Sequence, residues 1–450
     1  MEKRGTFGSK LAIILATAGS AVGLGNIWRF PFMAGHNGGA AFILVYFACV
    51  LLLGIPGMIS EFMVGRHAQT NAARAYGQMG GKAWRWIGYL GILTSTIILG
   101  FYAVVAGWCL QYLYASLVGR LQGDPAYIVS YFQEFSSDPL RPCLWAVGFV
   151  LITHIVVSKG VNDGIERASK LLMPLLMIIL LILVMASCLL PGAVGGIEFL
   201  LKPDFSKVSR DVFLEALGQA FFSLSLGTSC LCTYASYFKR DTNLLRSATH
   251  IALLDSFIAI LAGLMIFPAA FSVGVQPDSG PSLIFITLPN VFQQAFSGMP
   301  VVGYVIAVLF NALLVFAALT STISMHEIGT AFFHEELKLP RQRAAWILTV
   351  VCSLIAVFCS LSVGAYKGIS LFGLSLMDFC DMLTAQLMLP VGAFLTSIMM
   401  GWFVNRQLLH DEFTNYGTVR ATFFSAYLFS VRYIVPLCIL LIFLHQFGVL

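Results

Sequence analysis

The sequence feature that most restricts the fold is an apolar segment with glycines and a charge near its centre. Residues 11–34 are long enough to cross a bilayer as a helix, which takes about 20 residues. Yet the stretch GSAVGLGNIWRFP at 19–31 contains three glycines, and a glycine inside a helix costs about 1 kcal/mol relative to alanine. Asn26 and Arg29 follow, and a charge in mid-membrane costs about 2.5–3.5 kcal/mol on insertion scales. A segment that served only as an anchor would avoid this composition.

Two interpretations of this stretch follow from its residues. The spacing Gly19-x-x-x-Gly23 is a small-residue pattern by which membrane helices pack closely. Alternatively, the helix is broken here, and its free carbonyl and amide groups hold an ion and a small solute. Backbone at membrane depth unwinds only where protein buries it or where it lines a cavity. A dinucleotide-binding loop is excluded because Gly23-x-Gly25 lacks a third glycine and a preceding strand.

The composition indicates a membrane protein with almost no soluble mass. Of the 450 residues, 58% are hydrophobic and 10% are charged, whereas soluble domains carry about 25% charged residues. We therefore expect one polytopic α-helical domain over 1–450, surrounded by lipid, and the net charge of +5 requires no nucleic-acid partner. No nucleophile–base motif or nucleotide loop is visible, so we predict neither an enzyme nor an organic cofactor. Cys230-x-Cys232 lacks the further ligands of a metal site, and Cys143, alone in its loop, implies no disulfide.

Eleven membrane spans are predicted from the apolar segments. Basic residues crowd every second loop, and most of the 26 lysines and arginines share a side with Lys3 and Arg66. By the positive-inside rule this side and the N-terminus are cytoplasmic, and an odd number of spans puts the C-terminus outside. Between spans seven and eight, 282–296 is too short to cross, so we expect an outer re-entrant helix. The predicted spans are 11–36, 40–65, 87–118, 143–158, 167–190, 213–238, 247–272, 300–333, 342–362, 369–403 and 426–447.

A second interruption is predicted in the sixth span, 213–238. Its middle crowds four hydroxyl residues and a glycine between 223 and 229, and serine and threonine compete for the hydrogen bonds of a helix. A hydroxyl-rich packing face is the alternative. Interruptions at corresponding places in two halves of opposite topology indicate a transport site near the membrane midplane. We therefore predict two inverted repeats, 11–190 and 213–403, followed by an eleventh span at 426–447.

These stretches resemble the neurotransmitter:sodium symporter family over essentially the whole chain. The short termini are similar to those of prokaryotic members that carry leucine and other hydrophobic amino acids. The resemblance implies an all-α membrane protein with the LeuT-type 5+5 inverted repeat, broken helices 1 and 6 and an added eleventh span, in the bacterial inner membrane. The motifs are GSAVGLGNIWRFP at 19–31 followed by Asn37-Gly38-Gly39, GIPGMISEFMVGR at 54–66, SKGVNDGIERASKLLMP at 158–174, GQAFFSLSLG at 218–227, TYASY at 233–237 and ALTSTIS at 318–324.

The resemblance also implies two sodium sites made of oxygen ligands. The first takes the carbonyls of Ala21 and Ser223, the side chain of Asn26, the hydroxyl of Ser223 and the carboxylate of Asp255. The second takes the carbonyls of Gly19, Val22 and Ala317 and the hydroxyls of Thr320 and Ser321.

Asp255 departs from the leucine-carrying members, which have asparagine at this position. A fixed carboxylate beside sodium replaces the chloride that animal members bind, so we expect chloride-independent transport. A protonated aspartate in the protein core is the alternative.

An amino-acid site between the two breaks is implied as well. The substrate carboxylate would face the helix N-terminal end at Leu24 and Gly25, where free amides favour an anion, and Tyr102 would donate its hydroxyl to it. Gly23 stands where monoamine carriers of the family have an aspartate, so we expect a substrate with its own carboxylate. The substrate amine would meet the carbonyls of Ala21 and Phe222 and the region of Ser223 and Ser225.

The pocket for the substrate side chain is expected to be wide and mostly apolar. Its residues are Ile98, Phe222, Thr228 and Met325, with Ser321 at the edge. Leucine carriers have phenylalanine where this chain has Thr228, and the loss of that ring enlarges the pocket. Methionine adapts to varied shapes. We expect large hydrophobic or aromatic L-amino acids as substrates.

Charge pairs are implied as gates on both sides of the site. The outer pair is Arg29 with Asp378, with Phe222 as a lid over the substrate. The inner pair is Arg4 with Glu335, supported by Tyr237. Three further intramembrane acids are functional candidates by default. Glu61 matches a family position that bonds the backbone near the first break, and Glu327 or Asp381 carries a counter-transported proton or is paired structurally.

Two functions of different classes fit these residues. The first is a symporter driven by the sodium gradient, in which sodium and substrate each raise the affinity for the other by the same factor. The second is an amino-acid sensor of the same fold without net transport. The chain shows no signalling domain, which favours the symporter.

Overall fold

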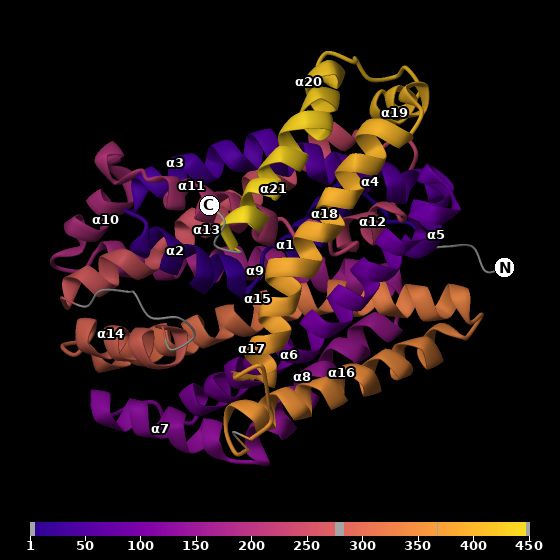
Figure 1. The fold of residues 1–450 in the computed structure, drawn as a ribbon. Helices are drawn as coiled ribbons and strands as arrows, with labels where there is room; N and C mark the ends of the chain where they lie inside the picture. Colours follow the sequence, from indigo (N-terminus) through magenta and orange to yellow (C-terminus); the bar gives the residue numbers. More distant parts are fainter. Residues whose placement is uncertain (1–4, 275–282, 367, 447–450) are drawn as a thin grey trace.

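The computed structural model describes residues 5–274, 283–366 and 368–446. Nearly all secondary structure in these residues is helical, and the long helices run side by side as a bundle (Figure 1). A single two-stranded hairpin, β1 (Ser370–Leu371) with β2 (Leu374–Ser375), accounts for the strand content of the described residues. The fold is therefore the all-α membrane architecture expected from the sequence.

The first half of the chain, up to the second break, contains eleven α-helices. They are α1 (Lys10–Ala21), α2 (Phe30–His36), α3 (Ala40–Cys49), α4 (Ile55–Ala68), α5 (Ala72–Gly80), α6 (Arg85–Leu117), α7 (Pro125–Ser137), α8 (Arg141–Ser158), α9 (Arg167–Cys188), α10 (Ala193–Leu201) and α11 (Arg210–Ser223).

The rest of the described chain adds ten more. They are α12 (Cys230–Ala235), α13 (Leu244–Ser272), α14 (Leu288–Ala295), α15 (Pro300–Glu336), α16 (Arg341–Val363), α17 (Leu376–Met382), α18 (Leu389–Ile398), α19 (Arg406–Phe413), α20 (Phe424–Phe429) and α21 (Val435–Gln446).

Short π- or 3-10-helical turns adjoin these helices. They are η1 (Gly25–Arg29), η2 (Val50–Gly54), η3 (Lys82–Trp84), η4 (Val161–Glu166), η5 (Phe205–Lys207), η6 (Leu283–Thr287), η7 (Leu383–Met388), η8 (Met399–Phe403) and η9 (Ser430–Ile434).

The predicted spans correspond closely to these helices. Within the described residues, nine helices are long and apolar enough to cross a membrane, and a tenth span is the bent pair Lys10–Ala21 and Gly25–His36. The remaining predicted span, 213–238, consists of α11 and α12, and each of these is too short to cross alone.

The first predicted break is present in the structure. Helix α1 ends at Ala21 because Val22 is extended, with φ −70° and ψ 109°, and the chain resumes as η1 at Gly25. The two pieces are bent by 59° relative to each other. Of the two interpretations of the glycine-rich stretch, the broken helix is the one that the structure adopts.

The second break separates α11 from α12 by six residues without regular helix. Ser225 and Ser229 adopt left-handed conformations, with φ of 53° and 61°, and Gly227 has φ 82°. A Cβ atom at Gly227 would lie 2.3 Å from the carbonyl oxygen of Leu389, so only glycine fits there. The hydroxyl-rich middle of the sixth span is therefore an unwound loop.

Two predicted boundaries differ from the structure. The tenth span begins at Leu376 rather than 369, because the chain first turns through Phe372 and Gly373, both with positive φ, into the small hairpin. Cys143 lies in the first turn of α8, where its thiol donates to the carbonyl of Val357, rather than in a loop. The re-entrant segment is helical from Leu283 to Ala295, as expected, and its first residue, Ser282, lies outside the described residues.

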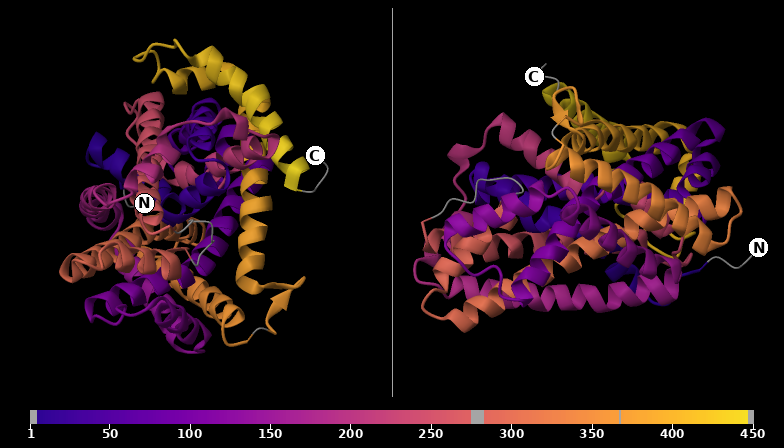
Figure 2. Two further views of the ribbon diagram at one scale, coloured as in Figure 1. Left: turned by 90° about the vertical axis from the view of Figure 1, so that its left-hand side faces the viewer. Right: turned by 90° about the horizontal axis from the view of Figure 1, so that it is seen from below.

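Loops predicted to share a side of the membrane gather at the same end of the bundle. Helices α5 and α19 lie toward one end, at the right of Figure 1, and α7, α10 and α14 lie toward the other. A view along the bundle places α18 to α21 as an arm along one side (Figure 2). We call the α5 and α19 end inner and the α7, α10 and α14 end outer. The assignment of these ends to cytoplasm and exterior remains the prediction from basic residues.

Candidate functional site

A cluster of oxygen atoms lies where the first break meets α11 and α13. Asp255 of α13 is fully buried. Its Oδ2 accepts a hydrogen bond from the Ser223 hydroxyl at 2.7 Å, and its Oδ1 accepts one from the Asn26 amide at 2.8 Å. Tyr46 of α3 donates its hydroxyl to Oδ2 at 3.4 Å. The Asn26 side-chain oxygen in turn accepts the N–H of Gly23 at 3.0 Å. A carboxylate and several neutral oxygens thus converge within the bilayer.

This cluster has the chemistry of a hard-cation site. A buried carboxylate is expensive in a membrane unless an opposite charge accompanies it, and oxygen ligands suit such a cation. Three of the four residues predicted for the first sodium site contact one another, and the fourth, Ala21, is the last residue of α1 beside them. Tyr46 was missed, because a tyrosine in an apolar span gives no local signal of what it faces.

The second predicted sodium site also comes together. The carbonyl of Val22, released by the end of α1, accepts hydrogen bonds from the Thr320 and Ser321 hydroxyls of α15, each at 3.3 Å. The single hydroxyl proton of Thr320 also lies within reach of the carbonyl of Ala317, at 3.0 Å between the two oxygens. A Cβ atom placed on Gly19 would lie 3.4 Å from the Cβ of Thr320, so the fifth residue adjoins the same place. Two carbonyls and two hydroxyls surround a position next to the break.

Between these clusters lies the loop predicted to bind the substrate carboxylate. The N–H of Leu24 donates to the hydroxyl oxygen of Tyr102 at 3.2 Å, so amide and phenol adjoin as the resemblance implied. A Cβ atom on Gly23 would approach Ser321 Oγ to 2.5 Å and the Tyr102 oxygen to 3.3 Å. On Gly25 it would lie 3.1 Å from the ring of Phe222. The two glycines keep this space clear of side chains.

The other predicted pocket residues are placed less closely. Ile98 and Met325 are half-buried on α6 and α15. The Thr228 hydroxyl donates to the Ser225 carbonyl at 2.7 Å and accepts the N–H of Cys230 at 3.0 Å. Thr228 therefore caps the start of α12, a role that the comparison with phenylalanine did not reveal. Ser225 contributes its carbonyl and its left-handed turn to the same loop.

The outer charge pair differs from the prediction. The guanidinium of Arg29 lies over the ring of Phe222, 4.1 Å from its centroid, which agrees with the expected lid. Its electrostatic partner is Asp381, however, not Asp378. Asp378 is exposed and accepts the hydroxyl of Ser375 at 2.7 Å, within the N-terminal cap of α17. Asp381, one turn further along α17, is the acid within electrostatic range of Arg29.

At the inner end, the carboxylate of Glu335 accepts hydrogen bonds from the hydroxyl of Thr70 and the N–H of Asn71, both at 2.7 Å. Its predicted partner Arg4 lies outside the described residues. Tyr237 donates its hydroxyl to Glu327 at 2.5 Å, and Glu327 is paired with Arg341. This pairing favours the structural role of Glu327 over proton transport.

Glu61 was expected to bond the backbone near the first break. Its carboxyl group instead accepts the N–H of Gly227 at 2.7 Å, in the second break. Helix α4 packs against α12, which brings Glu61 to the loop that precedes α12. The prediction that Glu61 bonds the backbone of a helix break is thus correct, but the break is the second one and not the first.

Similarity to known proteins shows the family of this chain. A profile described as Sodium:neurotransmitter symporter family matches residues 4–127 and 140–449. The chain belongs to this family of sodium symporters. It is an integral membrane protein of a transporter family, and the membership agrees with the resemblance seen in the motifs.

Relatives of the symporter extend over nearly its full length. The uncharacterized sodium-dependent transporter YhdH of Bacillus subtilis (strain 168) is 38% identical over 452 residues, covering 100% of this chain and 99% of that protein. An uncharacterized sodium-dependent transporter of Haemophilus influenzae is 34% identical, covering 99% of this chain and 98% of that protein. The crystal structure of MhsT in complex with L-phenylalanine matches with a TM-score of 0.89 and 38% identity, over 98% of this chain and 99% of that one. The LeuT-type fold is thereby confirmed.

Proposed function

We propose that this protein imports hydrophobic or aromatic L-amino acids together with sodium by alternating access. One observation carries the proposal: the first break lies between two separate oxygen clusters, centred on Asp255 and on Thr320. The family supports sodium as the coupling ion. MhsT, of the same fold, was crystallised with L-phenylalanine, which supports an amino acid with a large apolar side chain.

We propose one sodium ion for each cluster, and of the described residues in the two clusters only Asp255, in the first, has a carboxylate. We propose that Asp255 stays ionised beside sodium and that no chloride is needed. The hydrogen bonds from Ser223 and Asn26 support an ionised carboxylate, because each donates to a different oxygen of Asp255.

The space beside Gly23 supports a zwitterionic substrate. The Leu24 amide and the Tyr102 hydroxyl offer hydrogen-bond donors to a carboxylate, and the Tyr102 proton is free to turn toward it since its oxygen accepts from Leu24. The carbonyl of Ala21, at the end of α1, and that of Phe222, which also accepts the N–H of Ser225 at 3.1 Å, are the acceptors proposed for an ammonium group. A ligand carboxylate next to the first sodium site would couple the binding of the two.

Uptake into proteoliposomes tests this function. With an inward sodium gradient, labelled L-phenylalanine or L-leucine should accumulate above its equilibrium level, and replacing chloride by gluconate should leave the rate unchanged within about twofold. A sensor of the same fold would bind these amino acids without accumulation. Accumulation that is equal in sodium and choline would contradict sodium coupling.

We also propose that the protein lies in a bacterial inner membrane, with its N-terminus in the cytoplasm and its C-terminus outside, and that it divides into inverted repeats at 11–190 and 213–403. The separation of the loops toward two ends of the bundle supports this topology (Figure 1). Labelling of single cysteines introduced at Ser137 in α7 and at Asp411 in α19 should show the first accessible from outside and the second only after permeabilisation.

A further inference from the structure

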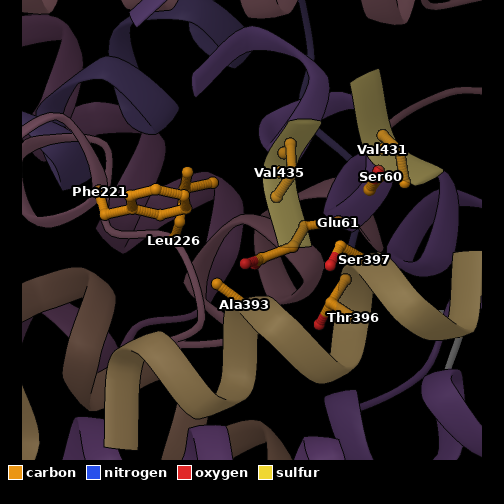
Figure 3. A pocket seen from close by; sticks show the side chains of 10 residues that line it. Ser60, Glu61, Phe221, Leu226, Ala393, Thr396, Ser397, Val431 and Val435 are labelled. Carbon is orange, nitrogen blue, oxygen red and sulfur yellow. The ribbon is translucent and has the colours of Figure 1, made fainter. Parts of the chain in front are cut away.

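A small cavity adjoins the second break, and none of its lining residues belongs to either oxygen cluster. Its volume is about 10 Å³, which is the room that one water molecule needs. Figure 3 shows the side chain of Glu61 in its centre, with Thr396 and Ser397 of α18 on one side and Val431 and Val435 on another. The transport function proposed above assigns this cavity no role.

The carboxyl group of Glu61 is only half used by its protein neighbours. The residue is 1% exposed. Oε1 accepts the N–H of Gly227 at 2.7 Å, and the backbone of Cys232 contributes a weaker contact to the carboxyl group. Oε2 has no hydrogen-bond partner in the described part of the chain. One oxygen thus fastens the loop of the second break, and the other is left in the wall of the cavity.

No cation compensates a charge on Glu61 among the groups that the structure describes around it. Arg66, on the same helix, is paired with Glu412 at 2.7 Å. Arg432 of η9 donates to the carbonyl of Gly401 and lies over the ring of Trp402. The other buried glutamates of the described residues differ, since Glu327 and Glu412 each contact an arginine and Glu166 contacts Lys170. An unpaired ionised carboxylate in such a place is strongly disfavoured relative to the neutral acid.

Among the described residues, the titratable side chains that face Glu61 from neighbouring helices are tyrosines and cysteines, and none is a lysine, arginine or histidine. Tyr76 of α5 and Cys230 of α12 interact electrostatically with Glu61. Cys232 of α12 interacts electrostatically with Tyr76 and contacts Glu61 through its backbone. Tyr427 of α20 contacts the hydroxyl of Ser60 beside it, at 3.0 Å. Helix α18 contributes hydroxyl and apolar side chains to the cavity and no charge. These neighbours supply nothing that would hold a negative charge.

The hydroxyl groups that line the cavity decide its polarity. Ser60, Thr396 and Ser397 each donate to a backbone carbonyl three or four residues earlier in the same helix, at 2.7 to 3.0 Å. Ser60 and Thr396 each also bond a tyrosine hydroxyl at 3.0 Å, that of Tyr427 and that of Tyr76, which leaves each of these two oxygens one lone pair. Their oxygen atoms therefore offer lone pairs rather than protons to whatever lies in the cavity. A wall of acceptors disfavours a carboxylate and favours a group that donates.

We propose that Glu61 is a proton-binding site and that the cavity holds one water molecule beside it. The acid donates its proton from Oε2 to the water, and the water donates to the oxygens of Thr396 and Ser397. Oε1 stays free to accept the Gly227 amide, so the proton and the loop of the second break are held by the same carboxyl group. Loss of the proton would place a negative charge against these lone pairs and weaken that loop.

Infrared spectroscopy of the purified protein with sodium at neutral pH tests this directly. The spectrum of the wild type minus that of Glu61→Gln should contain the carbonyl stretch of a protonated carboxyl group, shifted in heavy water. A difference spectrum that contains only carboxylate bands would overturn the proposal. The test needs no transport, so it fails or succeeds independently of the proposed symport.

Measurements of ligand binding distinguish a protonated Glu61 from a Glu61 that only supports the structure. Glutamine keeps an acceptor for Gly227 and a donor toward the cavity, as the neutral acid does, so Glu61→Gln should bind labelled L-phenylalanine in sodium within about twofold of the wild type. Glu61→Ala leaves the Gly227 amide unpaired and should bind at least tenfold more weakly. As the pH is raised, binding by the wild type should fall before that of Glu61→Gln. A Glu61→Gln protein that binds as weakly as Glu61→Ala would show that a charge is required and would contradict the proposal.

Discussion

At the scale of single residues, the site depends on where side chains are missing as much as on where they point. Gly23 adjoins both Ser321 and Tyr102, and the approach of a Cβ atom to 2.5 Å from Ser321 Oγ exceeds what packing tolerates. Its neighbours come from α6 and α15, which are distant in sequence. The motif indicated the importance of this glycine, whereas the reason for it lies in contacts that only the folded chain supplies.

Replacement of Gly23 by alanine should therefore impair the substrate site. The added methyl group collides with Ser321 and reaches Tyr102, so we expect the affinity for L-phenylalanine to fall at least tenfold in a sodium-dependent binding assay. Gly218 of α11 is a matched control, because a Cβ atom there meets nothing within 4 Å. Gly218→Ala should bind normally and be slightly more stable. Equal binding by both variants would remove Gly23 from the site.

Asp255 carries the prediction of chloride independence. Asparagine at this position keeps one oxygen to accept the amide of Asn26 and offers an amide to the hydroxyl oxygen of Ser223, but it removes the charge beside the first sodium. We expect Asp255→Asn to lose at least tenfold in sodium affinity in chloride-free medium, measured by the sodium dependence of substrate binding. If sodium affinity is unchanged, Asp255 is neutral in the wild type and the alternative of a protonated core aspartate holds.

Thr228 tests the width of the pocket. A phenylalanine in its place fills the space beside the substrate, so Thr228→Phe should shift the preference among labelled amino acids toward smaller side chains. It also removes the cap on Cys230, and Thr228→Val is the control that removes the hydroxyl without adding a ring. If both variants keep the wild-type preference, Thr228 is a cap and not part of the pocket.

At the scale of elements, the sequence predicted the spans and both breaks, but it did not predict which side of each helix faces which neighbour. Apolar length alone determines that a helix crosses, which is why most boundaries agree within a few residues. Asp378 and Asp381 lie one turn apart on the same short helix. The sequence predicted Asp378 as the partner of Arg29, because the composition of this span does not show which of the two side chains faces that residue. The partner of Glu61 was misassigned for the same reason, because the apolar composition of α4 does not show which neighbouring segment this side chain faces. The hairpin at 370–375 depends on positive φ at Phe372, which the residue type does not suggest.

One element at the inner end of the bundle, α19, is held in place by an ion pair. Helix α19 is held by Glu412, whose Oε2 accepts the Nε of Arg66 at 3.0 Å, and Arg66 also donates to Thr242 and Asn415 at 2.6 Å. Burial alone would raise the pKa of Glu412, but the hydrogen bond from His67 and the charge of Arg66 lower it to about 2. A glutamate has a pKa of about 4.3 when unfolded, so its contribution to stability is complete above that value.

This pair should therefore fail in acid. Its stabilisation should be lost as the pH falls from about 4.3 toward 2, and hydrogen exchange of 406–416 should accelerate over that window. At neutral pH, Glu412→Gln should lower the free energy of unfolding by about 3–5 kcal/mol because it leaves Arg66 buried without a partner. Asp411→Asn, one residue earlier and partly exposed, should change it by no more than about 0.5 kcal/mol. Similar melting temperatures for the two variants would contradict the role of the pair.

At the scale of the whole molecule, the two interrupted helices give a membrane protein its polar interior. The released carbonyl of Val22 and the turned loop around Gly227 contact residues of α15, α4 and α18, so groups that are distant in sequence converge at mid-bundle. Family motifs supplied the residues proposed to bind sodium, and contacts within the fold added Tyr46 beside Asp255 and Asp381 beside Arg29. The predicted inner pair of Glu335 with Arg4 stays a prediction, because Arg4 lies outside the described residues.

The most direct test of the account is sodium-dependent uptake of L-phenylalanine into proteoliposomes, compared with the same vesicles in choline. If backbone and side-chain oxygens at the first break hold sodium beside the substrate, uptake should exceed equilibrium only with an inward sodium gradient, and Thr320→Val or Asp255→Asn should each abolish the excess. Uptake of equal extent in sodium and choline, unaffected by both substitutions, would contradict the central claim.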